Sequence, residues 1–399
     1  MKVVVVGPAD AAAVAAAWAP GLAGTLRGVV GYPARPTELL VGSLLRAGVE
    51  VELVTLSPSV ATAVTLTEGP LSILVGAYRP AGRARDLFRA ERRELASLLA
   101  QTDGDVLHAH WTYEFAWSIL ADRRPRVVTV HDAPLTILRH MPSAYRAVRA
   151  GMAYRVRAGS FRGIAVSPYV AARWRREMVD RRSFRIISNF VSVGGRVAPR
   201  AGSLRLVSVG DASRRKNIRP LLRAFRSVRR RHPAASLRLV GAGLGAGDPL
   251  AAWARNQRLG GGVEWLGRRE HAATLAEMAA ADVVVHPSLE ESFGMSVAEA
   301  MAMGVPVVGG RRSGAVPWLL DQGRAGVLVD VRSPHSLAGG VLGVLEDPDS
   351  AGRTGAAAAR RIAEHFSTGS VLEAHLRVYE QAAGRAPDGG TAQRPEEDR

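Results

Sequence analysis

The stretch His286-Pro-Ser-Leu-Glu-Glu-Ser-Phe-Gly-Met-Ser-Val-Ala-Glu-Ala-Met-Ala-Met-Gly-Val-Pro-Val-Val308 decides the fold class, because strand and helix patterns follow one another in it. Residues 282–286 have the apolar pattern of a buried parallel strand, and residues 287–294 are predicted to form a turn. A short helix is predicted over residues 295–303, where Gly304 and Pro306 end it. A second strand follows over residues 305–308, which makes this segment a piece of an α/β sheet.

Two carboxylates flank the predicted turn. Glu291 precedes the helix and Glu299 lies in its second turn, so both can border a bound group without touching each other. An anion at this turn would meet free backbone N–H groups and the positive end of the helix dipole. The arrangement suits a ligand that carries hydroxyls next to a phosphate.

Length and composition limit the classes of protein to consider. The chain has 399 residues, of which 47% are hydrophobic, so we expect two globular domains with buried cores. It has no cysteine, which excludes disulfides, thiolate metal sites and cysteine nucleophiles and fits a reducing, cytoplasmic location. Residues 1–19 resemble a signal peptide, but Pro8 and Asp10 interrupt the apolar segment and favour a first strand over residues 3–6.

The chain is basic in an unusual way. Its formal charge is +17, yet Lys2 and Lys216 are its only lysines. Such skewed arginine usage is typical of a genome-wide base bias, so the charge does not predict a nucleic-acid partner. Twelve arginines lie between Arg139 and Arg185, against two acidic residues. This segment is either a solvated helical face or a surface for an anionic membrane or a phosphate-bearing acceptor, and both interpretations stay open.

Strands and helices alternate in two similar cycles, which predicts two Rossmann-like, doubly wound domains facing each other across a cleft. We expect an acceptor-binding domain over residues 1–196, a linker over 191–203 and a donor domain over 197–368. A helix over residues 369–384 would pack back toward the first domain, and residues 385–399 are predicted to be a disordered tail. The predicted parallel strands are residues 3–6, 49–53, 106–110, 126–130, 163–166, 185–187, 204–210, 236–240, 263–266, 283–286, 305–308 and 326–329.

A second motif is a basic turn after the first strand of the second cycle. In residues 208–220, Arg214, Arg215 and Lys216 cluster between a predicted strand and a helix start. Cations there could bind a diphosphate and stabilise it as a leaving group, although a solvated basic loop is the alternative. The lysine supports the first interpretation, because this chain otherwise uses arginine.

These motifs together resemble the retaining glycosyltransferases of the GT-B fold, family 4. The resemblance is specific in the second half, where Glu291 and Glu299 form an E-x7-E pattern and Val209-Gly precedes Lys216-Asn. Further matches are residues 302–308, 314–320, 326–329 and 239–243, and in the first half residues 106–111, 128–132, 166–167 and 187–189.

The resemblance implies a role for each matching residue. Glu291 would bind hydroxyls of the donor sugar, Glu299 the ribose hydroxyls, and Arg215 and Lys216 the diphosphate. His131 would reach the sugar from the other domain, and Glu291, His131, Lys216 and Arg215 are the predicted catalytic residues. The remaining predicted donor-binding residues are Arg214, Ser292, Phe293, Gly294, Met295, Ser296, Gly243 and Gly31.

The same resemblance implies the ligands. The donor would be a nucleoside-diphosphate sugar, UDP- or GDP-linked, and the acceptor a hydroxyl group of a glycan, a lipid-linked or a small molecule. No metal and no further cofactor are required, and no nucleic acid is involved. Retention of configuration is explained in this family by same-face attack, with the leaving phosphate accepting the proton.

Three positions depart from the family pattern. Asp211 stands where an arginine is usual, so Arg214 or Arg215 would substitute for it. The segment Asn189-Phe-Val-Ser192 replaces an Asn-Gly-Val-Asp signature. Gly28 and Gly31 are the best match for an N-terminal glycine pair, which affects acceptor binding more than donor binding.

Other interpretations of the same residues are possible. The chain could be a GT-B epimerase, an inverting transferase, or a non-catalytic module that binds polyanions. His131 could be a core histidine. Asp103-Gly-Asp105 precedes a strand and Asp347-Pro-Asp349 is expected in a turn after a helix, so neither is placed to hold a metal. His108 and His110 are expected on opposite faces of their strand, which argues against shared metal ligation.

Overall fold

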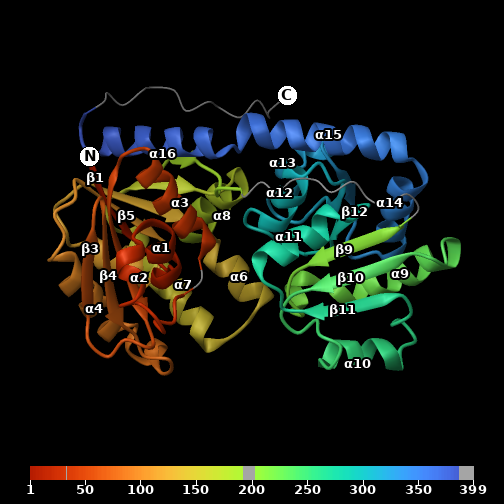
Figure 1. Cartoon of the computed structure of the whole chain (residues 1–399), viewed down its shortest axis with the longest axis horizontal. Helices are drawn as coiled ribbons and strands as arrows, with labels where there is room; N and C mark the ends of the chain where they lie inside the picture. The colour runs from red at the N-terminus through yellow and green to blue at the C-terminus, as the bar shows by residue number, and fades with distance from the viewer. Residues whose placement is uncertain (33, 192–202, 386–399) are drawn as a thin grey trace. The chain divides into compact units, whose positions relative to one another are not determined.

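The computed structural model describes residues 1–32, 34–191 and 203–385 (Figure 1). The chain divides into two compact units. The N-terminal unit comprises Met1–Phe190 together with the segment from Thr368, and the C-terminal unit comprises Val191–Ser367. Each is built on a largely parallel sheet, so the predicted pair of Rossmann-like units is confirmed. The predicted linker, apart from Val191 and Ser203, and the predicted tail, apart from Arg385, lie outside the described residues.

The N-terminal unit contains an eight-stranded sheet in the order β3-β4-β2-β1-β5-β6-β7-β8. Every neighbouring pair is parallel except β3 with β4. Most central strands are buried along almost their whole length, as parallel strands covered on both faces must be. The strands are β1 (Lys2–Val6), β2 (Glu50–Ser57), β3 (Val64–Glu68), β4 (Leu71–Ala77), β5 (Val106–His110), β6 (Arg126–Val130), β7 (Arg162–Ala165) and β8 (Phe184–Ile186).

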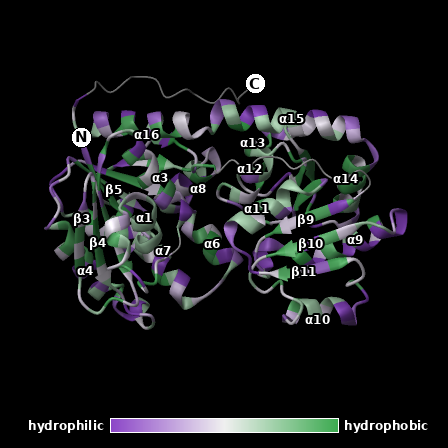
Figure 2. Cartoon of the chain, in the orientation of Figure 1, coloured by the Kyte–Doolittle hydropathy of each residue, from purple (hydrophilic) through white to green (hydrophobic). Residues whose placement is uncertain are grey.

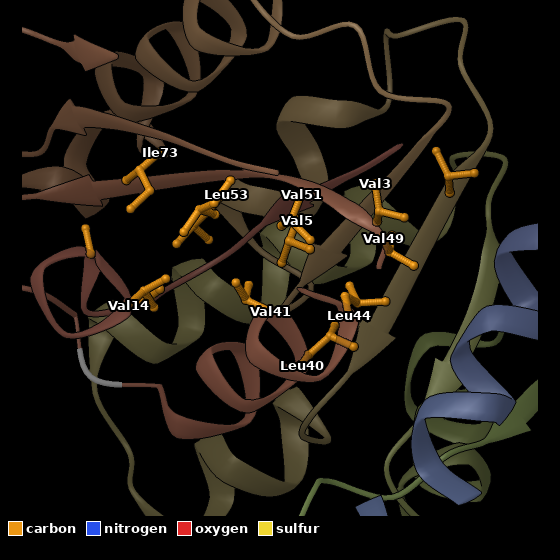
Figure 3. Packing of buried hydrophobic residues seen from close by; sticks show 14 of the residues in the cluster. Val3, Val5, Val14, Leu40, Val41, Leu44, Val49, Val51, Leu53 and Ile73 are labelled. Carbon is orange, nitrogen blue, oxygen red and sulfur yellow. The ribbon is translucent and has the colours of Figure 1, made fainter. Parts of the chain in front are cut away.

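Helices cover both faces of this sheet, and the alternation along β1 shows how. Val3 and Val5 pack in one core cluster with α1 and α3, whereas Val4 and Val6 pack in another with α4 and α5. Figure 3 shows residues of the first cluster, with sheet side chains facing those of α3. The helices are α1 (Ala11–Trp18), α2 (Pro20–Ala23), α3 (Arg35–Arg46), η1 (Arg83–Asp86), α4 (Arg89–Leu99), α5 (Glu114–Ile119), α6 (Pro134–His140), α7 (Ala144–Arg157), α8 (Pro168–Met178) and α16 (Thr368–Ala382).

The hairpin β3–β4 departs from the prediction of only parallel strands in this half. β3 is antiparallel to β4 and forms the edge of the sheet, where alternate residues are exposed. The signal was present, because Val64-Thr-Leu-Thr-Glu68 alternates apolar and polar residues before the turn at Gly69-Pro70. β3 has no continuous apolar run because one face of this edge strand is exposed, whereas β4 is buried along most of its length.

The expectation that His108 and His110 point to opposite faces was wrong. Residues two apart in a strand share a face, and the two imidazole rings lie with their centroids 4.4 Å apart. His108 is fully buried and its ring nitrogens bond to the hydroxyls of Tyr379 and Thr129, each at 2.7 Å. These histidines therefore belong to the packed interior of the unit.

The C-terminal unit contains a six-stranded, entirely parallel sheet in the order β11-β10-β9-β12-β13-β14. Figure 2 shows hydrophobic residues concentrated on the strands and hydrophilic residues on outer helices such as α9. The strands are β9 (Arg205–Val209), β10 (Ser236–Val240), β11 (Val263–Gly267), β12 (Val283–His286), β13 (Val307–Gly310) and β14 (Val327–Val329). The helices are η2 (Arg214–Lys216), α9 (Ile218–Arg231), α10 (Pro249–Asn256), α11 (His271–Ala279), α12 (Met295–Ala302), α13 (Val316–Leu319), η3 (Asp321–Gly323), α14 (Pro334–Glu346) and α15 (Pro348–His365).

Helix α15 begins at Pro348, where the sequence predicted a turn. The segment Asp347-Pro-Asp349 opens this helix instead of forming a turn. The Asp347 carboxylate accepts a hydrogen bond from the Ser350 N–H at 2.9 Å, and Pro348 occupies the first helical position. An aspartate N-cap followed by proline is a standard helix start.

Helix α16 packs in the N-terminal unit although it follows the whole C-terminal unit in sequence. Val371, Val378 and Tyr379 are buried in the same core cluster as β1 and α3. The Tyr379 hydroxyl lies 2.7 Å from His108 Nδ1, which links α16 directly to β5. A polar contact inside an apolar core thus fixes the position of this helix.

We expect replacement of Tyr379 by phenylalanine to loosen α16. The substitution leaves a buried imidazole nitrogen without a partner, which costs about 1–3 kcal/mol. Hydrogen exchange of the α16 amides measures this loss as reduced protection. Tyr154→Phe is the matched control, because this tyrosine is 50% exposed and its change should alter stability by less than about 0.5 kcal/mol. Equal loss in both variants would contradict the role of the Tyr379–His108 contact.

Candidate functional site

The strand order of the C-terminal unit identifies the edge where a ligand should bind. Numbered from β9, the order is 3-2-1-4-5-6, so the connections reverse direction between β9 and β12. In open parallel sheets, ligands bind outside the carboxyl ends of the two strands at this reversal. The basic turn follows β9 and the turn containing Glu291 follows β12. The two motifs found in the sequence therefore meet at the expected edge.

The Glu291 carboxylate joins these two turns. Lys216 Nζ lies 2.5 Å from Glu291 Oε1, and Arg215 Nη1 lies 3.3 Å from Oε2. His286 Nε2 lies 3.2 Å from Oε1. The side chain of Glu291 is 10% exposed and that of Lys216 is 14% exposed, so this is a largely buried cluster of charges.

Electrostatics keep Glu291 ionised. Burial alone would raise the pKa of this carboxyl, but the Lys216 ammonium, the His286 ring and the Arg215 guanidinium outweigh that effect and hold its pKa well below its ordinary value. Burial lowers the pKa of His286, although Glu291 opposes the shift. Neutral His286 therefore donates a hydrogen bond to a carboxylate that carries its full charge near neutral pH.

The basic turn is held in place by backbone contacts. Asn217 has a left-handed backbone (φ 57°), and its side-chain amide donates to the carbonyls of Pro287 (3.0 Å) and Val331 (2.8 Å). Arg215 Nη1 also donates to the Glu290 carbonyl at 2.9 Å. Arg214, by contrast, is exposed and makes no hydrogen bond or ion pair within the described chain. Of the three predicted cations, the structure brings two to Glu291.

Two glycines allow the neighbouring turns to approach closely. Gly241 adopts φ 138°, and a Cβ there would lie 1.6 Å from the Gly210 carbonyl oxygen. Gly243, a predicted donor-binding residue, adopts φ 74° and packs against Ala212 in the turn after β9. Larger residues at either position would push the turns after β9 and β10 apart.

The N-terminus of α12 presents the N–H groups that the sequence predicted. Gly294 precedes the helix with φ 97°, and no side chain caps it. The N–H groups of Met295 and Ser296 donate to no acceptor in the described residues. They are among the unsatisfied N–H groups that make a helix start attractive to anions. The Ser296 hydroxyl lies 3.4 Å from His286 Nδ1, on the opposite side of that ring from Glu291.

The other predicted residues around α12 either pack in the core or offer polar groups. Phe293 is buried, and its ring packs edge-on against those of Trp318 and Phe366. Its side chain supports the turn, and only its backbone is left for a ligand. Glu299 is 6% exposed, and His271 Nε2 lies 2.9 Å from its Oε1. Ser292 is half-buried at the turn.

His131 and Gly31, also predicted site residues, lie in the N-terminal unit. Burial lowers the pKa of His131 to about 3, with the nearby His375 contributing, so the ring is neutral at physiological pH. Its Nε2 lies 2.9 Å from His110 Nδ1. Gly31 packs against Asp10, where a Cβ would lie 2.4 Å from the Asp10 Cα. His131 also lines a cavity of about 300 Å³ within this unit.

His286 and His271 were not predicted as site residues, although each bonds to a predicted site carboxylate. His286 had a usable signal, because it ends a predicted strand at the edge where ligands bind. No sequence signal marks His271, because α11 comes close to Glu299 only in the folded unit. Across residues 1–32, 34–191 and 203–385 there is no group of three histidine or acidic side chains suited to a metal. No helix in the same residues is long and apolar enough to cross a bilayer.

Comparison with known proteins identifies the family. The model of the group 1 glycosyl transferases matches residues 197–361, and that of glycosyltransferase family 4 matches residues 35–194. The phosphatidyl-myo-inositol mannosyltransferase of Mycolicibacterium smegmatis is 30% identical over 312 residues, which cover 74% of this chain and 76% of that protein. This chain belongs to the family 4, group 1 glycosyltransferases.

Other relatives match less of the chain. Glycogen synthase of Mycobacterium tuberculosis is 33% identical over 181 residues, which cover 45% of this chain and 43% of that protein. The chain thus spans less than half the length of this relative. Among solved structures, sucrose-phosphate synthase from Thermosynechococcus elongatus aligns with 97% of this chain at 18% identity and a TM-score of 0.78. Anabaena HepE in complex with UDP aligns with 96% of the chain at 18% identity and a TM-score of 0.66. These likenesses confirm the GT-B fold.

We expect Glu291→Gln to destabilise the C-terminal unit. The substitution leaves Lys216 and Arg215 close together without their counter-charge, and losing one partner of a buried pair costs about 3 kcal/mol. Because the pKa of Glu291 is lowered in the folded state, its contribution is present above the ordinary value of 4.5 and is lost as the pH falls toward the lowered value. Calorimetry between about pH 7 and pH 3 should show the two proteins converging in acid.

Glu264→Gln provides the control for this experiment. Glu264 is 43% exposed and pairs with Arg238 at 2.9 Å, so its loss should cost less than about 1 kcal/mol. A difference between wild type and Glu291→Gln that stays constant down to acid pH would contradict the assignment.

Proposed function

We propose that this protein transfers a sugar from a nucleoside-diphosphate donor, UDP- or GDP-linked, to a hydroxyl acceptor with retention of anomeric configuration. The observation that carries the proposal is the contact of Lys216 and Arg215 with Glu291 at the strand reversal of the C-terminal unit. Family membership supports the reaction class. The UDP bound to HepE, a protein with the same fold, supports a nucleotide-linked donor.

The proposed site offers different groups to the two ends of the donor. The diphosphate would lie against the N–H groups of Met295 and Ser296 and the cations of Lys216 and Arg215. An ammonium has three N–H donors, so Lys216 can keep its bond to Glu291 and still bind a phosphate oxygen. Glu291 would then accept hydrogen bonds from sugar hydroxyls, and Glu299 from the ribose.

The chemistry requires stabilisation of a leaving group more than it requires a protein nucleophile. As the bond between the sugar and the phosphate breaks, negative charge grows on the diphosphate and positive charge on the sugar ring. Fixed cations and helix N–H groups stabilise the first, which lowers the barrier. The acceptor hydroxyl attacks from the same face, and its proton passes to the departing phosphate oxygen.

His131 would serve as a neutral hydrogen-bonding group in this scheme. Its pKa of about 3 means that it carries no positive charge near neutral pH. One ring nitrogen is occupied by His110, which leaves Nδ1 for a hydroxyl of a bound sugar. A role as a protonated acid is not part of the proposal.

We expect Lys216→Ala and Glu299→Ala to weaken binding of the matching nucleotide, UDP or GDP, by about 10- to 100-fold. Each variant removes a charge-assisted hydrogen bond worth about 1.5–3 kcal/mol, and 1.4 kcal/mol corresponds to tenfold in Kd. Titration calorimetry with both nucleotides measures the loss. Arg226→Ala is the control, because this exposed arginine of α9 makes no contact with the site. Undiminished affinity in the first two variants would contradict the donor site.

The reaction product tests which sugar is transferred and whether its configuration is retained. A donor panel screened for transfer identifies the sugar, and the anomeric proton of the product distinguishes retention from inversion. A protein that binds nucleotide without turnover would favour the non-catalytic alternative.

A membrane-bound acceptor is supported by only part of the arginine-rich segment between Arg139 and Arg185. Five of its twelve arginines are half-buried, and Arg182, for example, donates to the carbonyls of Arg157 and Gly159. The other seven are exposed, and the same segment also exposes Tyr154 and Val179. Exposed cations beside exposed apolar side chains favour an anionic lipid surface. The exposed arginines are Arg139, Arg155, Arg162, Arg175, Arg176, Arg181 and Arg185.

We expect vesicles with anionic lipid to sediment this protein more strongly than neutral vesicles. Each exposed arginine near the surface contributes about 1 kcal/mol of attraction, which salt should screen. Co-sedimentation with and without anionic lipid measures the effect, and Arg175→Gln with Arg176→Gln should reduce it. Equal partitioning into both vesicle types would favour the solvated helical face.

A further inference from the structure

His286 is a buried polar side chain at the strand reversal of the C-terminal unit, and the proposed chemistry gives it no task. It is the last residue of β12 and is 2% exposed, so any effect on a ligand must pass through its neighbours. Its backbone pairs with Gly309 of β13, and Pro287 after it restricts it to an extended conformation. The sheet therefore fixes where this imidazole ring lies.

The two ring nitrogens contact two of the predicted donor-binding residues. Nε2 lies 3.2 Å from Glu291 Oε1, and Nδ1 lies 3.4 Å from the Ser296 hydroxyl. The Glu291 carboxylate is ionised and can only accept, because its pKa is held well below the ordinary value. The proton of the neutral ring therefore lies on Nε2, which leaves Nδ1 to accept from Ser296. The contacts run in one direction, from Ser296 through His286 to Glu291.

Ser296 brings the phosphate end of the proposed site into this series of contacts. It lies in the first turn of α12, and its backbone N–H donates to no acceptor in the part of the chain that the structure describes. That N–H is one of the groups proposed to bind the diphosphate, while the hydroxyl of the same residue contacts the ring. Glu291, at the other side of the ring, is the group proposed to bind the sugar. His286 thus connects the two ends of the proposed donor site.

His286 shares its partner oxygen with Lys216, whose Nζ lies 2.5 Å from the same Glu291 Oε1. The two donors differ in mobility, because a lysine ammonium sits on a flexible stem whereas this imidazole is enclosed at the end of a strand. An incoming diphosphate would attract Lys216. His286 then remains as the contact that holds Oε1 in place. Such placement matters, since a shift of about 1 Å in a catalytic group can cost about 100-fold in rate.

We propose that His286 is a positioning residue, oriented by Ser296, that keeps Glu291 directed at the sugar while Lys216 binds the diphosphate. It acts through Glu291 and does not touch the donor. The proposal rests on the proposed transferase function and adds a residue to its machinery. A histidine that only fills the core would be replaceable by leucine, whereas a positioning residue needs an N–H donor at the place of Nε2.

Hydrolysis of nucleotide sugars by three variants tests the proposal. UDP-glucose, UDP-N-acetylglucosamine and GDP-mannose serve as donors, since slow hydrolysis needs no acceptor. We expect His286→Leu to lower kcat about 10- to 100-fold and to leave the Kd of UDP or GDP unchanged, because a free nucleotide carries no sugar for Glu291 to hold. His286→Asn, whose amide reaches only the place of Nδ1, should lose kcat likewise. His286→Gln, whose amide reaches the place of Nε2, should retain most of it.

The role of Ser296 has a test of its own. Ser296→Ala removes the hydroxyl and keeps the N–H, so it should lower kcat less than His286→Leu does, with nucleotide affinity retained. The double variant should lose no more than His286→Leu alone, because the hydroxyl acts through the ring. Additive losses would show that the two residues act separately and would overturn the proposal.

His232→Leu is the matched control. His232 Nε2 lies 3.0 Å from Glu346 Oε1, which makes this pair a second histidine–carboxylate contact of the same unit, between the ends of α9 and α14. Neither residue belongs to the turns after β9 and β12. The variant should therefore hydrolyse donors and bind nucleotides as the wild type does.

UDP and GDP titrations distinguish failure of this proposal from failure of the proposed function. Nucleotide bound normally by the His286 variants shows that they are folded and that the phosphate end of the site is intact. The proposal alone is overturned if His286→Leu hydrolyses donors like the wild type, or if the glutamine variant loses as much kcat as the asparagine variant. A wild type that binds neither nucleotide and hydrolyses none of the donors overturns the proposed function, and this proposal with it.

Discussion

The contact between Glu291 and Lys216 is the constraint on which the C-terminal site depends. It joins two turns that are 75 residues apart in sequence and follow different strands. Without the carboxylate, two cations would face each other in a largely buried position without a counter-charge. The charge of Glu291 therefore serves the fold before any ligand arrives. A donor that brings its own negative charge meets cations that are already in position.

Much of the C-terminal unit could be predicted from the sequence because its signals are local. The strands are short apolar runs, and helix α12 is bounded by Gly294 and Gly304. The choice of partners could not be predicted, because it depends on backbone angles. Asn217 adopts a left-handed conformation, and the turn before it directs Lys216 and Arg215 toward Glu291 while Arg214 stays exposed. The sequence alone therefore does not distinguish the two cations that contact Glu291 from the exposed one.

The N-terminal unit was less predictable for a related reason. Its edge strand β3 has the alternating pattern of a strand exposed on one face, which differs from the buried runs around it. The twelve arginines between Arg139 and Arg185 likewise look uniform, yet Arg149 and Arg182 are half-buried among rings and carbonyls. Composition predicts that such a segment is basic. Only packing decides which guanidinium groups remain available to a partner.

The same topology gives the two units different chemistry at equivalent positions. After β12, the chain turns through a glycine into a helix whose first N–H groups are unsatisfied, which favours an anion. After β5, the chain instead passes through Trp111 in a left-handed conformation and fills the corresponding edge with aromatic rings. Backbone N–H groups favour an anion whatever it is attached to, whereas aromatic rings favour a flat apolar surface. The strained backbone of Trp111 is tolerated because the packed sheet around it holds the residue in place.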